Sequence, residues 1–182
     1  MSESALVLLV PEAEVLVRPF RDRHDPSAAA GMPAHITLLF PFKPPEAIDA
    51  AVLDELQQCF AGFAPFSFTL AETRRFEAPE AVLYLAPEPA ETFRALTRVI
   101  WQRSPETPPY RGRHPDIVPH LSVARVAERQ QLDAIALRFA PAAAAVLPIR
   151  ATAAEVALME TRFGRWRMRT MLRLGRTPGS SA

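Results

Sequence analysis

The sequence predicts an α+β fold in which one structural unit occurs twice, and two features support this prediction. Short apolar runs of strand length alternate along the chain with longer segments whose apolar residues recur at helical spacing. The segments that begin at His35 and at His120 each predict a strand, a helix and a second strand. The proline before that second strand follows the histidine by 30 residues in the first segment (Pro65) and by 28 in the second (Pro148). We therefore expect two related halves about a pseudo-twofold axis, with equivalent residues facing one another.

The individual elements follow from the apolar spacing and from the prolines that interrupt it. The first half predicts strands and helices in alternation: strands over residues 5–10, 34–40, 66–70 and 82–85, helices over 11–20 and 46–60, and a polar loop over 21–31. The second half continues the pattern: helices over 91–102 and 128–139, strands over 120–126, 153–159 and 166–174, a proline-rich loop over 104–119 and a turn over 162–164. We expect one bilobal domain over residues 1–176 and a flexible tail over 177–182.

The composition favours a cytoplasmic globular protein. Of the 182 residues, 49% are hydrophobic and 23% charged, an ordinary balance for a packed domain. The single cysteine, Cys59, excludes both an intramolecular disulfide and a cysteine-based zinc site. The apolar run near the N-terminus is six residues long and follows Glu3 instead of a basic residue, so we expect no secretory signal. No apolar run approaches the roughly 18 residues of a membrane span, so we expect no membrane partner.

The charge is unevenly distributed between the two halves. Residues 1–90 hold 6 basic and 13 acidic side chains, a net charge of −7, whereas residues 91–182 hold 15 and 7, a net charge of +8. A basic half favours an anionic ligand because it raises the local concentration of that ligand. The same distribution also fits a surface without a binding role.

Two short motifs contain the residues that could take part in a chemical reaction. Residues two apart in a strand project from the same face, so His35 projects with Thr37, and His120 with Ser122. Each half therefore offers one imidazole beside one hydroxyl on an otherwise apolar strand. A single histidine of this kind is more often a structural residue, but two copies in repeated units favour a function.

This set of groups suits phosphoryl transfer. One neutral imidazole can remove a proton from water or from a ribose hydroxyl, while one imidazolium donates a proton to the leaving oxygen. The hydroxyls of Thr37 and Ser122 can donate to the non-bridging phosphate oxygens. This chemistry needs no cofactor, and we expect none. The sequence does not assign the acid and the base.

The two motifs, His35-Ile-Thr37-Leu-Leu-Phe and His120-Leu-Ser122-Val-Ala-Arg, resemble those of the two-histidine (2H) phosphoesterase superfamily, in its 2′-5′ RNA ligase-like branch. The resemblance covers most of residues 5–175 and includes the Pro-Pro-Tyr110 segment before the second motif. It implies a bilobal α+β fold with two antiparallel sheets lining a central groove and helices outside. It also implies metal-independent action on 2′,3′-cyclic phosphates or related phosphodiesters of RNA ends and nucleotides. By position, His35 and His120 would be catalytic, and Thr37 and Ser122 would bind the phosphate.

Three further residues are candidates for contact with the substrate. Tyr110 and Phe42 flank the second and first motifs, and each could stack on a base or simply pack. Arg125 follows the second motif, but a regular strand would turn it to the face opposite His120. In the last strand, Arg165, Arg167 and Arg169 alternate with apolar residues that include Trp166. We interpret the arginines as a solvated face and Trp166 as a core residue, although the arginines could instead line the groove and attract phosphates.

Other classes of site find little support. His24 and His114 lie in loops, no pair of histidines has metal-ligand spacing, and no carboxylate adjoins either motif, so we expect no metal site. No glycine-rich phosphate loop or dinucleotide fingerprint occurs.

Three hypotheses remain. The first is an enzyme acting on an RNA terminus or a small nucleotide, by hydrolysis or transesterification. The second is a binding module that holds the same ligands without turnover, and the third is an interaction protein with a relic of a site. Retention of all four motif residues argues against the third. We expect a monomer without an obligate protein partner, because a bilobal fold can complete its own groove.

Overall fold

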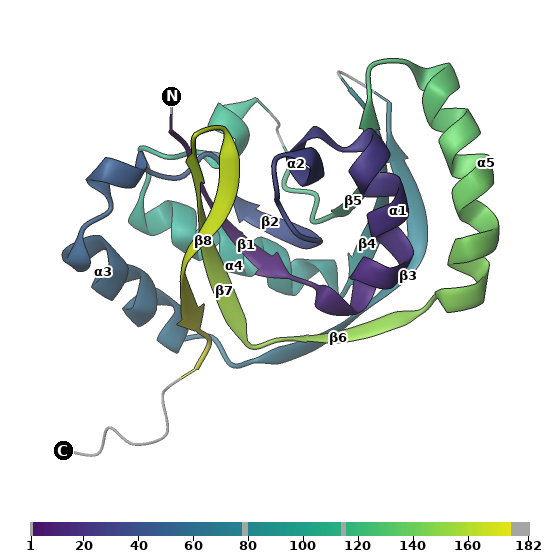
Figure 1. Ribbon diagram of the computed structural model, residues 1–182. Coiled ribbons are helices and arrows are strands. Elements are labelled where there is room, and N and C mark those ends of the chain that lie inside the picture. The colour runs from purple at the N-terminus through teal and green to yellow at the C-terminus, as the bar shows by residue number, and fades with distance from the viewer. Residues whose placement is uncertain (1, 78–79, 114–115, 176–182) are drawn as a thin grey trace.

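The computed structural model (Figure 1) describes residues 2–77, 80–113 and 116–175. The predicted tail and His114 lie outside the described residues. The helices and strands alternate along the chain: β1 (Ser4–Leu9), α1 (Glu14–His24), α2 (Pro26–Ala29), β2 (His35–Leu39), α3 (Ala50–Ala61), β3 (Phe66–Phe76), β4 (Ala81–Glu88), α4 (Ala90–Arg103), β5 (Leu121–Val126), α5 (Arg129–Val146), β6 (Ile149–Ala153), β7 (Glu155–Arg162) and β8 (Arg165–Arg173). Short 3-10 turns connect some of them: η1 (Pro11–Ala13), η2 (Pro45–Ala47) and η3 (Pro109–Gly112).

The strands form two four-stranded antiparallel sheets, which confirms the predicted α+β fold class. One sheet, with the order β2-β1-β7-β8, is called sheet A, and the other, with the order β5-β4-β3-β6, is called sheet B. The motif strands β2 and β5 each lie at the edge of their sheet, beside β1 and β4 respectively. They also contact one another, so the two sheets meet where the two motifs lie (Figure 1).

The internal repeat is visible in the order of elements. The succession β1-α1-β2-α3 in the first part of the chain matches β4-α4-β5-α5 in the second. The first helix of each unit packs against the motif strand of the other unit, α1 against β5 and α4 against β2. This exchange couples the two lobes through one shared core.

The main core lies between the sheets and the helices that cover their outer faces. Leu6 and Leu8 of β1 and Leu83 and Leu85 of β4 are buried there, because alternate residues of a strand share a face. The helices contribute apolar stripes at helical spacing, as Leu56 and Phe60 of α3 illustrate. The opposite faces of the sheets are thereby left to hold the motif side chains.

Several predicted boundaries were wrong for identifiable reasons. The predicted loop over 21–31 is largely helical, since α1 continues to His24 and the Asp25 side chain caps α2 by accepting from the backbone N–H of Ser27. The helix expected to end at Phe139 continues through Pro141 to Val146. Strand β6 was missed because its buried side chains are mostly small alanines. Among the described residues, no helix is long and apolar enough to cross a membrane.

Candidate functional site

The two motif histidines are held by the same local geometry. His35 is the first residue of β2, and its Nδ1 lies 2.7 Å from the carbonyl oxygen of Pro33. His120 directly precedes β5, and its Nδ1 lies 2.8 Å from the carbonyl oxygen of Val118. A carbonyl oxygen only accepts, so Nδ1 donates in both rings and Nε2 is the nitrogen left to exchange protons in each. The two halves of the repeat therefore hold their imidazoles in the same tautomer.

The environment of His35 favours its neutral form. Burial of the ring, and next the positive charge of Arg21, lower the pKa of His35 to about 4. Charge on His120 also lowers the pKa of His35, which means that the two rings lie within electrostatic reach of one another. At neutral pH, His35 is thus an uncharged imidazole whose Nε2 can accept a proton.

A buried ion pair supports the loop that leads into His35. Arg21 and Asp25 are 2% and 3% exposed, and Arg21 Nε donates to Asp25 Oδ2 over 3.0 Å. Arg21 Nη2 also donates to the carbonyl oxygen of Met32 over 3.1 Å. Since Met32 precedes Pro33, whose carbonyl fixes the His35 ring, the pair positions the catalytic candidate indirectly.

The ring of His120 is held by two aromatic side chains. It lies edge-on to Phe76 at 5.1 Å between centroids and to Tyr84 at 5.5 Å, and these two rings stack on each other at 4.3 Å. Sequence reasoning missed both residues, because their contact with His120 depends on the pairing of β3 with β4. It missed Arg21 and Asp25 too, although a charged pair at helical i, i+4 spacing beside apolar positions was a usable signal.

The two hydroxyls occupy matching places beside the histidines. Thr37 pairs with Val7 of β1, and Ser122 pairs with Tyr84 of β4. The phenol of Tyr110 is hydrogen-bonded to the Thr37 side chain, and burial raises the pKa of Tyr110. The Tyr110 backbone N–H donates to the carbonyl oxygen of Phe40 over 2.6 Å, at a left-handed φ of 51°. Of the two aromatic candidates, Tyr110 therefore reaches the site.

The expected orientation of Arg125 was wrong because β5 is not regular. The register between β4 and β5 shifts between Leu83 and Tyr84, so that Ser122 pairs with Tyr84 while Arg125 pairs with Val82. Directly paired residues share a face, and Val82 and Tyr84 lie two apart on one strand. The bulge thus turns Arg125 to the same face as Ser122, and its charge lowers the pKa of Tyr110. Arg125 belongs among the candidate phosphate contacts.

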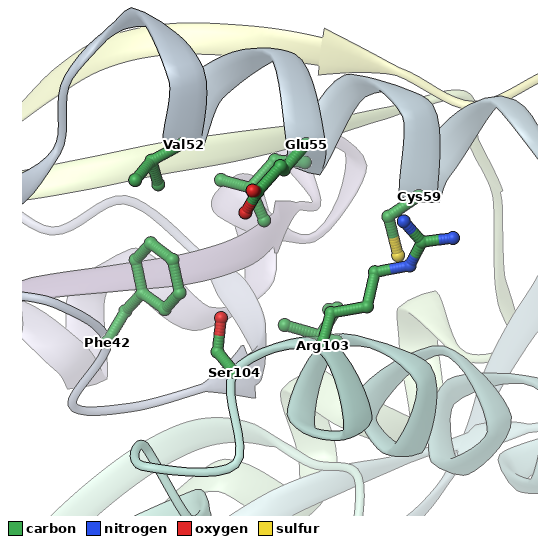
Figure 2. Close-up of a pocket in the computed structure, with 8 residues that line it drawn as sticks. Phe42, Val52, Glu55, Cys59, Arg103 and Ser104 are labelled. Atoms are coloured by element: carbon green, nitrogen blue, oxygen red, sulfur yellow. The ribbon is translucent and has the colours of Figure 1, made fainter.

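The structure places Phe42 in the main core, away from the motif hydroxyls. Its side chain is 5% exposed and lines a small pocket between α3 and α4 (Figure 2). The other lining residues are Val52, Glu55, Leu56, Cys59, Ile100, Arg103 and Ser104. None of the four motif residues lines this pocket, so we interpret Phe42 as a packing residue and not as a substrate contact.

The last strand is also irregular. The register of β7 with β8 shifts between Leu158 and Met159, which leaves Arg169 outside the alternation. Leu172 lies in the main core, but Trp166 packs at the edge of a separate cluster on the other face of sheet A. Trp166 thus packs against apolar side chains, as expected of a core residue, but it does so on the opposite face from Leu172, while the arginines 165, 167 and 169 are exposed as expected.

Metal ligands do not gather at the site. In the part of the chain that the structure describes, no three His, Cys, Asp or Glu side chains lie close enough to hold one ion. The polar side chains on the motif strands and beside them are instead two imidazoles, two hydroxyls, a phenol and a guanidinium.

Comparison with known proteins places this arrangement in a family. The model of the 2′-5′ RNA ligase superfamily matches residues 9–165. Among solved structures, E. coli LigT complexed with 3′-AMP superposes with a TM-score of 0.62 at 17% identity, covering 96% of this chain and 99% of that one. TT0787 of Thermus thermophilus gives 0.58 at 20%, covering 96% and 100%, and Usb1 of Kluyveromyces marxianus gives 0.52 at 13%, covering 94% and 97%. A search of curated proteins finds no significant match. The chain belongs to the 2′-5′ RNA ligase superfamily of two-histidine phosphoesterases.

Proposed function

We propose that this protein is a metal-independent phosphoesterase that acts on a 2′,3′-cyclic phosphate, or a related phosphodiester, of an RNA end or a nucleotide. The observation that carries the proposal is the matched pair of histidines, each with Nδ1 bonded to the carbonyl two residues earlier and each beside a hydroxyl. Because Nδ1 of each ring lies against a carbonyl oxygen, Nε2 is the nitrogen that exchanges protons in both, so that one neutral ring can accept a proton while the other ring, when protonated, donates one.

The environment of His35 favours the role of proton acceptor for this ring, which leaves the role of proton donor to His120. Neutral His35 accepts a proton from water through Nε2 as the water oxygen attacks phosphorus. The bond between phosphorus and one ribose oxygen breaks, and His120, in its protonated form, gives its proton to that oxygen. Thr37 and Ser122 donate to the non-bridging oxygens, and the Arg125 guanidinium offsets their charge. The product is a ribose monophosphate with a free neighbouring hydroxyl.

The comparisons support the choice of ligand. E. coli LigT has been crystallised with 3′-AMP, a nucleotide whose phosphate is on the 3′ oxygen. Hydrolysis of a 2′,3′-cyclic phosphate leaves a phosphate on the 2′ or the 3′ oxygen, so such a molecule is the kind of product that this reaction gives.

The proposal is tested by incubating the protein with the four 2′,3′-cyclic nucleotides in excess chelator and separating the 2′- and 3′-monophosphates. We expect turnover with one isomer predominating, because one geometry aligns one leaving oxygen. Absence of turnover together with retained binding of the nucleotides would replace the enzyme by the second candidate, a module that binds RNA ends.

A further inference from the structure

The backbone before His35 is anchored by an arginine of the preceding helix. His35 Nδ1 donates to the carbonyl oxygen of Pro33, two residues earlier, and the carbonyl oxygen of Met32, three residues earlier, accepts from Arg21 Nη2 over 3.1 Å. Arg21 therefore holds the peptide group next to the one that orients the imidazole. It belongs to α1, the first helix of the first unit of the repeat.

The same two contacts occur before His120. His120 Nδ1 donates to the carbonyl oxygen of Val118, two residues earlier, and the carbonyl oxygen of Ile117, three residues earlier, accepts from Arg94 Nε over 3.0 Å. Arg94 belongs to α4, the counterpart of α1 in the second unit (Figure 1). The two copies of the motif therefore share an arginine anchor as well as a histidine and a hydroxyl.

The two arginines do not stand at equivalent positions of the repeat. Arg21 precedes its histidine by 14 residues and Arg94 by 26. Arg21 lies in the last turn of α1, whereas Arg94 lies near the start of α4. The contact therefore recurs although the sequence positions do not, which favours a role for the contact itself.

The residue whose carbonyl orients the ring is exposed in both copies. Pro33 and Val118 are exposed, while Ala34 and Pro119, which follow them, are buried. An exposed side chain contributes little packing that would hold its own carbonyl in place. The direction of that carbonyl therefore depends on the contacts of the peptide groups on either side.

The second copy has fewer such contacts than the first. The Ala34 backbone N–H donates to the Glu14 carboxylate over 2.7 Å, which anchors the first loop at a second point. Pro119 occupies the corresponding position in the second loop, and proline has no N–H to donate. Among the described residues, Arg94 is the one side chain besides the motif histidine that hydrogen-bonds to residues 117–119. The second motif therefore depends more on its arginine than the first does.

The other contact of Arg94 does not explain its presence. Arg94 Nη1 lies 3.4 Å from Glu91 Oε2, and the two side chains are 35% and 64% exposed. An exposed ion pair of this kind adds little to stability. The bond to the Ile117 carbonyl is the better-formed of the two contacts, so the main effect of Arg94 is on the loop before the histidine.

We propose that Arg94 is a positioning residue for His120. By holding the Ile117 carbonyl it keeps the Val118 carbonyl aligned with Nδ1 of the ring, and so keeps Nε2 free to give its proton to the leaving oxygen. Its guanidinium acts through the backbone and not on the substrate. The inference rests on the proposed function and deepens it, since it names the residue on which the orientation of the acid depends.

Kinetics on a 2′,3′-cyclic nucleotide test the effect on the reaction. Arg94→Met removes the donor and keeps an unbranched side chain, and thermal unfolding shows whether the variant is folded. We expect kcat to fall about 10- to 100-fold, because a displaced ring transfers its proton poorly, and KM to stay within about twofold, because the ring does not bind the phosphate. Arg94→Lys, which keeps a charged donor, should recover most of the lost kcat.

The matched control is Arg98→Met on the same helix. Arg98 pairs with the same Glu91 over 2.6 Å and is 51% exposed, and within the described parts of the chain that carboxylate is its one hydrogen-bond partner. The control removes an equal charge without touching the loop. We expect its kcat and KM to stay within about twofold of the wild type.

The ring itself can be observed by NMR, whether or not a substrate is turned over. In protein with 15N-labelled histidine, the shifts of the two ring nitrogens show which one carries the proton, and His120→Ala assigns the signals of His120. At about pH 8, where an unperturbed histidine is neutral, we expect the proton on Nδ1 in the wild type and in Arg98→Met. In Arg94→Met we expect a mixture of both tautomers at His120 and unchanged signals of His35.

The outcomes separate this inference from the proposed function. An unchanged tautomer of His120 in Arg94→Met would overturn the inference, and a lower melting temperature beside it would assign Arg94 a merely structural role. A kcat of Arg94→Met within about twofold of the wild type would overturn it as well. If the wild type turns over no cyclic nucleotide, the proposed function fails, while the NMR experiment still decides whether Arg94 orients His120.

Discussion

Replacing Asp25 by alanine should destabilise the protein strongly, because it leaves the buried charge of Arg21 without a counterion. Asp25 accepts hydrogen bonds from Arg21 Nε at 3.0 Å and from the backbone N–H and hydroxyl of Ser27 at 3.0 and 2.8 Å. Both partners of the ion pair are almost fully buried. Removing one partner of such a pair costs about 3–5 kcal/mol, a large part of the stability of an ordinary domain.

The double variant Arg21→Met/Asp25→Ala removes the charge as well as its partner. We expect it to recover most of the loss, because an apolar side chain of similar length needs no counterion. The exposed pair Arg18–Asp22 on the same helix, at 3.6 Å, is the matched control, and Asp22→Ala should change stability by less than about 0.5 kcal/mol.

Urea unfolding of the four proteins measures these free energies. A single variant that loses less than about 1 kcal/mol, or a double variant no more stable than the single one, would refute the account of an uncompensated charge. In the single variant we also expect kcat/KM to fall, since the loop that this pair supports carries Pro33 and leads into His35.

Three further predictions concern the site. Because the pKa of His35 is about 4 when folded and near 6.5 when unfolded, the unfolded state takes up the proton first, and stability should fall as the pH drops from 6.5 to 4. The full difference between the two pKa values corresponds to about 3 kcal/mol of stability, which we reduce to about 1–2 kcal/mol because the ring is partly exposed. If thermal unfolding of His35→Gln showed the same pH dependence as that of the wild type, this prediction would be contradicted. Arg125→Gln should lower kcat/KM on a cyclic nucleotide about 10- to 100-fold, because the positive charge at the phosphate is lost. An effect within twofold would mean that Arg125 does not contact the phosphate. Tyr110→Phe removes the hydrogen bond to Thr37, so calorimetry should show a loss of about 0.5–1.5 kcal/mol, and no loss would mean that water replaces the phenol.

The sequence was sufficient to predict the fold class and most of the elements, because burial on one face leaves a periodic pattern. Alternation placed His35 and Thr37 on a shared face, as their pairing with Leu9 and Val7 has them. It also placed His120 with Ser122, and both residues lie beside Tyr84. The repeat was readable for the same reason, since two similar units bury similar patterns.

Departures from regular alternation could not be predicted. The bulges in β5 and β8 reversed the expected faces of Arg125 and Trp166, and a bulge is a property of strand pairing that the periodicity of one strand does not carry. Contacts between segments that are distant in the sequence could not be predicted either. Phe76 meets His120, and Tyr110 meets Thr37, only because the sheets bring them together.

The central claim is that two histidines perform the chemistry, and single-site replacement tests it most directly. His35→Ala and His120→Ala are compared with the wild type for hydrolysis of a 2′,3′-cyclic nucleotide in excess chelator, with folding checked by circular dichroism. The account predicts a loss of at least about 100-fold in kcat for each variant, as expected when a general acid or base is removed. Activity within tenfold of the wild type in either variant would contradict the two-histidine mechanism.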